Sequence, residues 1–194
     1  MLPSAQIEAV IDLTEQVAIS LSENGPAADI LVRKYFRDRR YAGSKDRRRV
    51  TELVYNIIRR WGYLVDITDR DVRRMVMAQL KLTDDDPYQY FTGEKHAPDA
   101  LTDDEKKFLE TVVPENEEHH RLNYPLWLEP ALKERFGDKF VQEMTALNER
   151  APLTLRIARN AEKILGYLND NHIGYSRGIH ANSAIILDQQ QQIR

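Results

Sequence analysis

The stretch "RDRRYAGSKDRRRVTELVYNIIRRWG", Arg37 to Gly62, decides the fold of this chain. Gly43 breaks the chain, and Ser44 is a favoured N-cap residue for the helix that follows. At about 100° per residue, the apolar side chains of that helix fall on one side and form a stripe typical of a core-facing helix. The stripe consists of Val50, Leu53, Val54, Ile57, Ile58 and Trp61. The pattern therefore predicts a helix that packs into an all-helical core.

Four basic residues of this helix fall on its opposite side, namely Arg48, Arg49, Arg59 and Arg60. Guanidinium groups fork onto phosphate oxygens, and the helix amino terminus near Ser44 and Lys45 is a favourable anion site. Tyr35 and Tyr41 are close enough in sequence to stack on bases, although core packing is the alternative for both. Arg47 falls near the core side, which favours an internal pairing or capping role. The predicted RNA-binding residues are Arg37, Arg39, Arg40, Lys45, Arg48, Arg49, Arg59 and Arg60.

The whole chain does not have the basic balance of a dedicated nucleic-acid protein. Its 194 residues carry a formal charge of −3, and the pI is about 6.0. Charge is strongly segregated, however, because residues 33–60 hold eleven Lys and Arg against three acids, whereas residues 82–118 hold twelve acids against three Lys. RNA binding would therefore come from a local patch. The acidic block is interpreted as a solvated face.

The chain contains no cysteine, which excludes disulfides and thiolate metal sites and favours a reducing, cytoplasmic location. No targeting signal or membrane-spanning apolar run is recognisable. His119 and His120 are adjacent, so on a helix their side chains should diverge by about 100°, and we expect no metal site there. Helix capping and solvation explain the carboxylates at 84–86 and 103–105 better than acid–base catalysis does.

Working outward from the basic stretch, helical spacing predicts helices over 4–24 and 26–39, the second burying Ile30, Leu31 and Phe36. Thr68 with Asp71 and Thr102 with Glu105 have the spacing of capping boxes and predict two more helices. Two further helices are expected on either side of Gly137. These elements predict a helical domain over residues 1–150.

After Pro152 the periodicity changes from helical to alternating. "PLTLRIA" and "SAIILD" are typical of strands, and the intervening "NAEKILGYLNDNHIG" is typical of a helix ended by Gly174. Residues 151–194 are therefore expected to begin a small α+β unit of β-α-β order. The predicted fold class is mainly α, a helical bundle followed by an incomplete α+β unit. Such a short unit buries little surface by itself, so we expect the chain to be the front part of a longer protein.

Two segments resemble a known family. "YAGSKDRRRVTELVYNIIRR" resembles the helix pair of the NusB-like RNA-binding domain. "NYPLWLEPALKERFG" with "EMTALNERAPLTLRI" resembles the stretch that follows this domain in the Sun/RsmB family of RNA cytosine-5 methyltransferases. The matching positions are Pro125, Trp127 and Leu128, then Arg150, Pro152, Leu153, Thr154, Leu155 and Arg156.

The resemblance implies an S-adenosylmethionine-dependent ribosomal RNA methyltransferase whose catalytic domain lies outside these residues. By the same resemblance, that domain holds two cysteines and a glycine-rich cofactor loop. We therefore expect no catalytic and no cofactor-binding residue in this chain, which alone should be inactive. The expected partner is RNA, in particular small-subunit ribosomal RNA, with weak self-association also open. The alternative is a stand-alone NusB-like binding or antitermination module without catalysis.

Overall fold

The computed structural model describes residues 1–149 and 151–188 and divides the chain into two units, Met1–Asn148 and Glu149–Arg194. The first unit is helical. Its α-helices are α1 (Pro3–Ser22), α2 (Ala28–Asp38), α3 (Ser44–Arg59), α4 (Trp61–Thr68), α5 (Val72–Leu82), α6 (Asp103–Thr111), α7 (Glu118–Arg121), α8 (Glu129–Phe136) and α9 (Phe140–Asn148). Three short 3-10 helices are η1 (Pro87–Gln89), η2 (Leu126–Leu128) and η3 (Gly137–Lys139).

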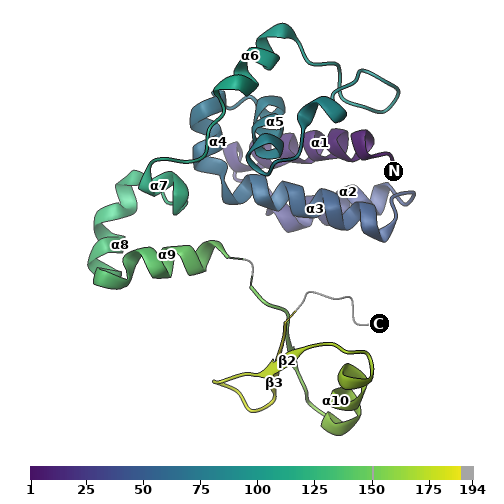
Figure 1. The fold of residues 1–194 in the computed structure, drawn as a ribbon, viewed down its shortest axis with the longest axis vertical. Helices are drawn as coiled ribbons and strands as arrows, with labels where there is room; N and C mark the ends of the chain where they lie inside the picture. Colours follow the sequence, from purple (N-terminus) through teal and green to yellow (C-terminus); the bar gives the residue numbers. More distant parts are fainter. Residues whose placement is uncertain (150, 189–194) are drawn as a thin grey trace. The chain divides into compact units, whose positions relative to one another are not determined.

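The core of the helical unit lies between α1, α3 and α5. Apolar residues three or four apart on α3 put Val50, Val54 and Ile57 on one buried side, as the sequence predicts. They pack in one cluster with Ile7 and Val10 of α1 and with the apolar side chains of α5. Figure 1 shows α1, α2 and α3 running side by side, with α5 across them. The basic stretch thus comprises the end of α2, the turn after it, α3 and the start of α4.

Three local predictions in this region are wrong. Ile30 is exposed, because α2 begins at Ala28 and buries the stripe of Val32, Tyr35 and Phe36 instead. The residue preceding α3 is Gly43 rather than Ser44. Thr68 ends α4 rather than capping α5, and the side chain of Asp71 accepts the hydrogen bond from the Arg74 amide.

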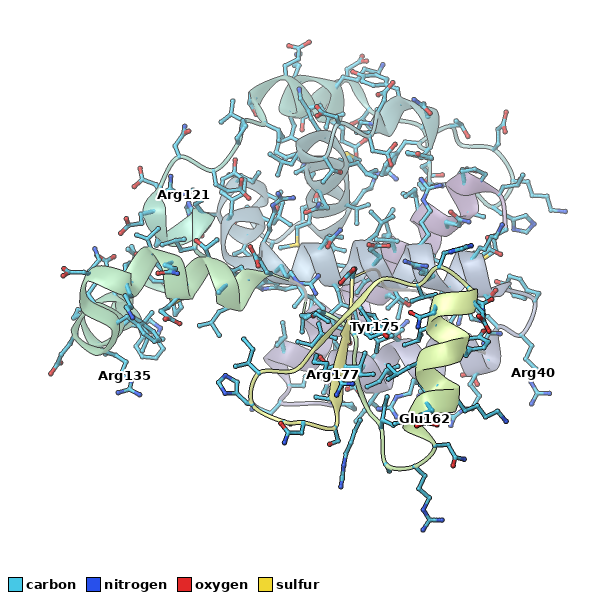
Figure 2. All side chains as sticks on the ribbon, turned by 60° about the horizontal axis from the view of Figure 1, so that its bottom comes forward. Arg40, Arg121, Arg135, Glu162, Tyr175 and Arg177 are labelled. Atoms are coloured by element: carbon cyan, nitrogen blue, oxygen red, sulfur yellow. The ribbon has the colours of Figure 1, made fainter. Side chains whose placement is uncertain are left out.

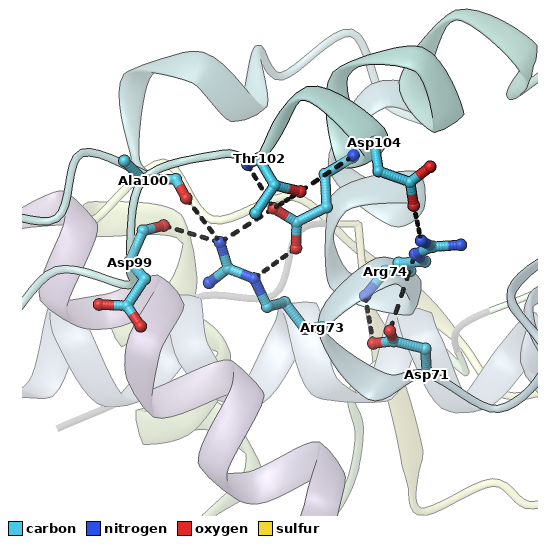
Figure 3. Close-up of polar contacts among 8 residues, drawn as sticks. Asp71, Arg73, Arg74, Asp99, Ala100, Thr102 and Asp104 are labelled. Atoms are coloured by element: carbon cyan, nitrogen blue, oxygen red, sulfur yellow. Dashed lines mark hydrogen bonds and ion pairs between the residues drawn. The ribbon is translucent and has the colours of Figure 1, made fainter.

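Ion pairs hold the acidic segment after α5 against the bundle. The interpretation of this segment as a solvated face is therefore incomplete. The Arg73 guanidinium of α5 donates to the Glu105 carboxylate at 2.7 Å and to the backbone oxygen of Asp99 at 2.7 Å. Arg74 pairs with Asp104 beside it (Figure 3). Glu105 also completes the predicted capping box with Thr102 at the start of α6. The acids of this segment therefore neutralise arginines of the helical core.

Helices α7, α8 and α9 lie at one end of the helical unit (Figure 1). They have a small hydrophobic cluster of their own, with Leu122, Tyr124, Phe140 and Met144 buried. The predicted break at Gly137 is confirmed, since this residue has a φ of 51° and a ψ of −131°, which favours glycine. No helix within the described ranges is both long and apolar enough to cross a membrane.

The second unit is a three-stranded antiparallel sheet with one helix, β1 (Thr154–Arg156), α10 (Ala161–Asp170), β2 (Tyr175–Arg177) and β3 (Ala184–Leu187). The strand order is β1-β3-β2, so β3 lies between the two strands that α10 connects. Leu168 of α10 packs against Ile185 and Leu187 of β3. The predicted fold class is confirmed, and the short strand β2 is an addition to it. This order is the split β-α-β arrangement.

Candidate nucleic-acid interface

Exposed cations gather at the carboxyl end of α2, the turn that follows it and the first turns of α3. Arg37, Arg40, Lys45 and Arg48 are all exposed. In Figure 2 the labelled Arg40 side chain extends outward from the turn between the two helices. Tyr41 in the same turn is 73% exposed. Four cations and one aromatic ring are thus accessible to a polyanion at the α2–α3 turn.

Arg39 is less available, because it lies over a buried tyrosine. Its guanidinium carbon is 3.7 Å from the centroid of the Tyr35 ring, and its Nη2 is 3.7 Å from the Asp12 carboxylate. Tyr35 donates a hydrogen bond to Asp12 at 3.2 Å. Burial, followed by the neighbouring Asp12 charge, raises the pKa of Tyr35 strongly. Of the two tyrosines considered for base stacking, Tyr35 belongs to the core and Tyr41 is accessible.

Arg49 does not share the solvent face predicted for it. Its Nη2 donates to the Tyr90 hydroxyl at 2.9 Å and lies 3.5 Å from the Asp85 carboxylate. Tyr90 in turn donates to Asp85 at 2.7 Å. Burial of the Tyr90 ring, together with its bond to Asp85, raises the pKa of that hydroxyl. Arg49 therefore anchors the start of the acidic segment.

Arg60 is paired in the same way, at the other end of α3. Its Nε lies 2.8 Å from the Glu115 carboxylate, and its Nη1 lies 3.4 Å from the side-chain oxygen of buried Gln79. Arg59 is half-buried and donates to the Asn56 side chain at 3.3 Å. The eight predicted residues therefore differ in exposure: Arg37, Arg40, Lys45 and Arg48 are exposed, with Arg37 lying 3.9 Å from the Asp38 carboxylate, whereas Arg39, Arg49, Arg59 and Arg60 are half-buried.

The amino terminus of α3 is already occupied by a carboxylate of the chain. Asp46 accepts hydrogen bonds from the Gly43 amide at 3.0 Å, from the Met1 amine at 2.9 Å and from Gln6 at 2.7 Å. The bonds from Met1, Gln6 and Gly43 lower the pKa of Asp46. Arg47 has a capping role, since its Nε donates to the Ala42 carbonyl at 2.8 Å. Lys45 therefore offers an anion only its own charge, because the Asp46 carboxylate already occupies the amino terminus of α3.

A separate cleft of about 610 Å³ opens between α1, α4 and the α7 region. Trp61, Tyr63 and Tyr124 contribute aromatic rings to its lining, together with His119 and His120. The two histidine rings lie 3.9 Å apart between centroids, so the predicted divergence of these side chains is wrong. The direction of the Cα–Cβ bonds alone does not fix where the rings lie, because the side-chain torsions also orient them. The adjacent His119 and His120 are the feature of the sequence that could have indicated this cleft.

The region from residue 124 to residue 194 matches a family model described as the ferredoxin-like domain of RsmF/B-like methyltransferases. The match includes α8 and α9 as well as the whole second unit. Among solved structures, the chain is similar to the crystal structure of PH0851, with a TM-score of 0.60 and 17% sequence identity. The superposition covers 99% of this chain and 50% of PH0851, so the chain spans about half the length of that protein. No curated protein matches the chain.

The described residues do not fit an S-adenosylmethionine site. Nucleotide-type cofactors bind beyond the carboxyl ends of parallel strands, where a glycine-lined turn admits the cofactor. Every strand pair within 1–149 and 151–188 is antiparallel. The turn between β1 and α10 carries the side chains of Arg159 and Asn160, and Asn160 has a φ of 54°. We assign no cofactor contact to residues 1–149 and 151–188.

Proposed function

We propose that this chain is the RNA-binding portion of an S-adenosylmethionine-dependent ribosomal RNA cytosine-5 methyltransferase. The observation that supports this most directly is the match of residues 124–194 to the RsmF/B-like ferredoxin-like domain. The similarity of fold to PH0851 over nearly the whole chain agrees with it. In this proposal the helical unit is NusB-like and binds RNA, most specifically small-subunit ribosomal RNA.

The chemistry of methyl transfer is assigned to a catalytic domain outside these residues. Carbon 5 of cytosine is a poor nucleophile until a thiolate adds to the ring, and the 194 residues contain no cysteine. The chain contributes by positioning, since RNA held against a fixed surface presents its target base to the catalytic domain at high effective concentration.

The RNA surface is proposed at the α2–α3 turn. Arg37, Arg40, Lys45 and Arg48 are exposed there, and Tyr41 offers a ring for stacking on an unpaired base. Arg49 and Arg60 are excluded from the revised surface because acids of the chain already pair with them. Arg39 and Arg59 are half-buried and are not assigned to this surface.

The test replaces the four exposed cations together with glutamine and measures binding to a fragment of small-subunit ribosomal RNA over a range of salt concentrations. Each lost phosphate contact should flatten the slope of log affinity against log salt by about 0.7 to 0.9, which gives about 3 for the quadruple variant. The matched control replaces Lys95, Lys107, Arg135 and Lys139, which are also exposed, and changes the net charge equally. Equal loss in both variants, or no loss in a folded quadruple variant, would contradict the proposed surface.

A second measurement tests the assignment of catalysis elsewhere. Calorimetry of the purified chain with S-adenosylmethionine should show no saturable binding, because the described residues offer no pocket of the required kind. A longer protein that includes the region after Arg194 should bind the cofactor and transfer a labelled methyl group to ribosomal RNA. Saturable binding by the chain alone would overturn this division of labour, and an inactive longer protein would favour the NusB-like binding module.

A further inference from the structure

Asp66 of α4 and the two histidines of α7 bring three metal-binding side chains together. One ligand atom of Asp66, one of His119 and one of His120 all lie within 4.8 Å of one another. The Nε2 of His120 is 2.8 Å from the Asp66 carboxylate, and the His119 ring lies 3.9 Å from the His120 ring between centroids. His120 follows Asp66 by 54 positions in the sequence, so the fold creates this cluster.

An ordinary ion pair explains only part of the arrangement. His120 and Asp66 form a hydrogen bond with each other, and the rings of His120 and Tyr63 are arranged edge to face with their centroids 5.3 Å apart. The His119 ring contacts His120 and, at 6.4 Å, Tyr124. Among the described residues its ring nitrogens have no hydrogen-bond partner. A ring nitrogen of His119 therefore lies near the pair and makes no hydrogen bond within the described residues.

We propose that Asp66, His119 and His120 bind a divalent transition-metal ion of the zinc class. Zinc bonds imidazole nitrogen and carboxylate oxygen at about 2.0 to 2.2 Å, which places two tetrahedral ligand atoms about 3.4 Å apart. The observed separations, from 2.8 Å to at most 4.8 Å, bracket that value, so small side-chain rotations suffice. Two nitrogens and one oxygen suit zinc, cobalt or nickel, whereas magnesium and calcium prefer oxygen ligands alone.

The position of the cluster indicates two roles for the ion, one in ligand binding and one in stability. Three protein ligands leave one tetrahedral position open, and the cluster lines the cleft of about 610 Å³ beside Trp61 and Tyr124. Since all three residues line the cleft, the open position would accept water or an anionic oxygen from it. The ion would also fasten α7, next to the small cluster around Tyr124, to α4 of the main core. This site is independent of the RNA surface at the α2–α3 turn.

The experiment titrates cobalt(II) into the full chain, stripped of metal and carrying no histidine tag. We expect one equivalent to bind with the intense visible absorption of a four-coordinate nitrogen–oxygen site, and zinc to displace it. Asp66→Asn and His119→Gln should each weaken binding by at least about tenfold. His180→Gln, at an exposed histidine of the second unit, is the matched control and should bind as the unaltered chain does.

A thermal readout separates loss of the site from loss of the fold. Asp66 is 62% exposed at its side chain and Asn keeps its shape, so Asp66→Asn should retain the helical circular dichroism of the chain. Zinc should raise the unfolding temperature of the unaltered chain and of His180→Gln, and not that of Asp66→Asn. The proposal is overturned if the unaltered chain shows no saturable binding, or if both cluster variants bind metal as tightly as it does.

Discussion

Arg48 and Arg49 are neighbours in sequence with different surroundings. Arg49 bonds to Tyr90 and lies beside Asp85, whereas Arg48 is exposed. Arg49→Gln should therefore lower the free energy of unfolding by about 1 kcal/mol, a value reduced for the partial exposure of the pair. Arg48→Gln should cost less, because the Arg48 side chain is exposed and interactions at exposed sites contribute little to stability. Urea unfolding of the two variants checks this, and equal losses would contradict the distinction.

Glu105 connects α6 to α5 through charge. Burial raises the pKa of its carboxyl, but hydrogen bonds from Arg73 and from the Thr102 backbone outweigh burial and hold the pKa below 4.5. A depressed pKa in the folded state contributes stability above the unfolded pKa, and this contribution is lost as pH falls through the folded value. Glu105→Gln should therefore cost about 1 to 2 kcal/mol at neutral pH.

The measurement is chemical unfolding of the unaltered chain and Glu105→Gln from pH 7 to pH 3. The difference in free energy between them should shrink as the pH falls below about 4.3, where the carboxyl begins to be protonated in the unfolded chain. Glu110→Gln, at an exposed position on the same helix, should show no such difference. A gap that stays constant with pH would exclude the ion pair as its cause.

Helix α3 has one buried side and one exposed side, and substitutions at two consecutive isoleucines compare how much each position contributes to stability. Ile57 is 1% exposed within the main core, whereas Ile58 is half-buried at its edge. Ile57→Ala should cost about 2 to 5 kcal/mol through lost burial and the cavity left behind, and Ile58→Ala clearly less. Thermal or urea unfolding of the two variants gives the comparison. Equal losses of stability would contradict the difference in burial between Ile57 and Ile58.

The elements that could be predicted from sequence are those whose signals are local. The apolar stripe of α3, the capping box at Thr102 and the break at Gly137 each depend on residues a few positions apart. β2 was missed because a three-residue strand is defined by its pairing with β3 rather than by its own pattern. The helical wheel placed Arg49 correctly on the side away from Val54, but a wheel contains no information about Asp85, which lies 36 residues farther along the chain.

At the scale of the whole chain, the two units have separate hydrophobic clusters. The main core belongs to residues within Met1–Asn148, and the sheet packs on α10 within Glu149–Arg194. We expect a fragment of residues 1–148 to fold alone and to unfold cooperatively within about 3 °C of the helical transition of the full chain. Circular dichroism melting of both proteins is the measurement. A fragment without a cooperative transition would place the boundary elsewhere.

The pairing of the acidic segment with arginines of α3 changes the thermodynamics of polyanion binding along that helix. A phosphate that meets an accessible cation at the α2–α3 turn displaces small counterions into bulk water, and this gain in entropy drives binding. A phosphate that meets Arg49 or Arg60 must instead displace Asp85 or Glu115, which remain tethered to the same chain. That reaction exchanges one anion for another and releases few counterions to solution. In the proposed RNA complex the acids would therefore limit entropically favourable phosphate contacts to the exposed cations of the α2–α3 turn, because Arg49 and Arg60 are already paired.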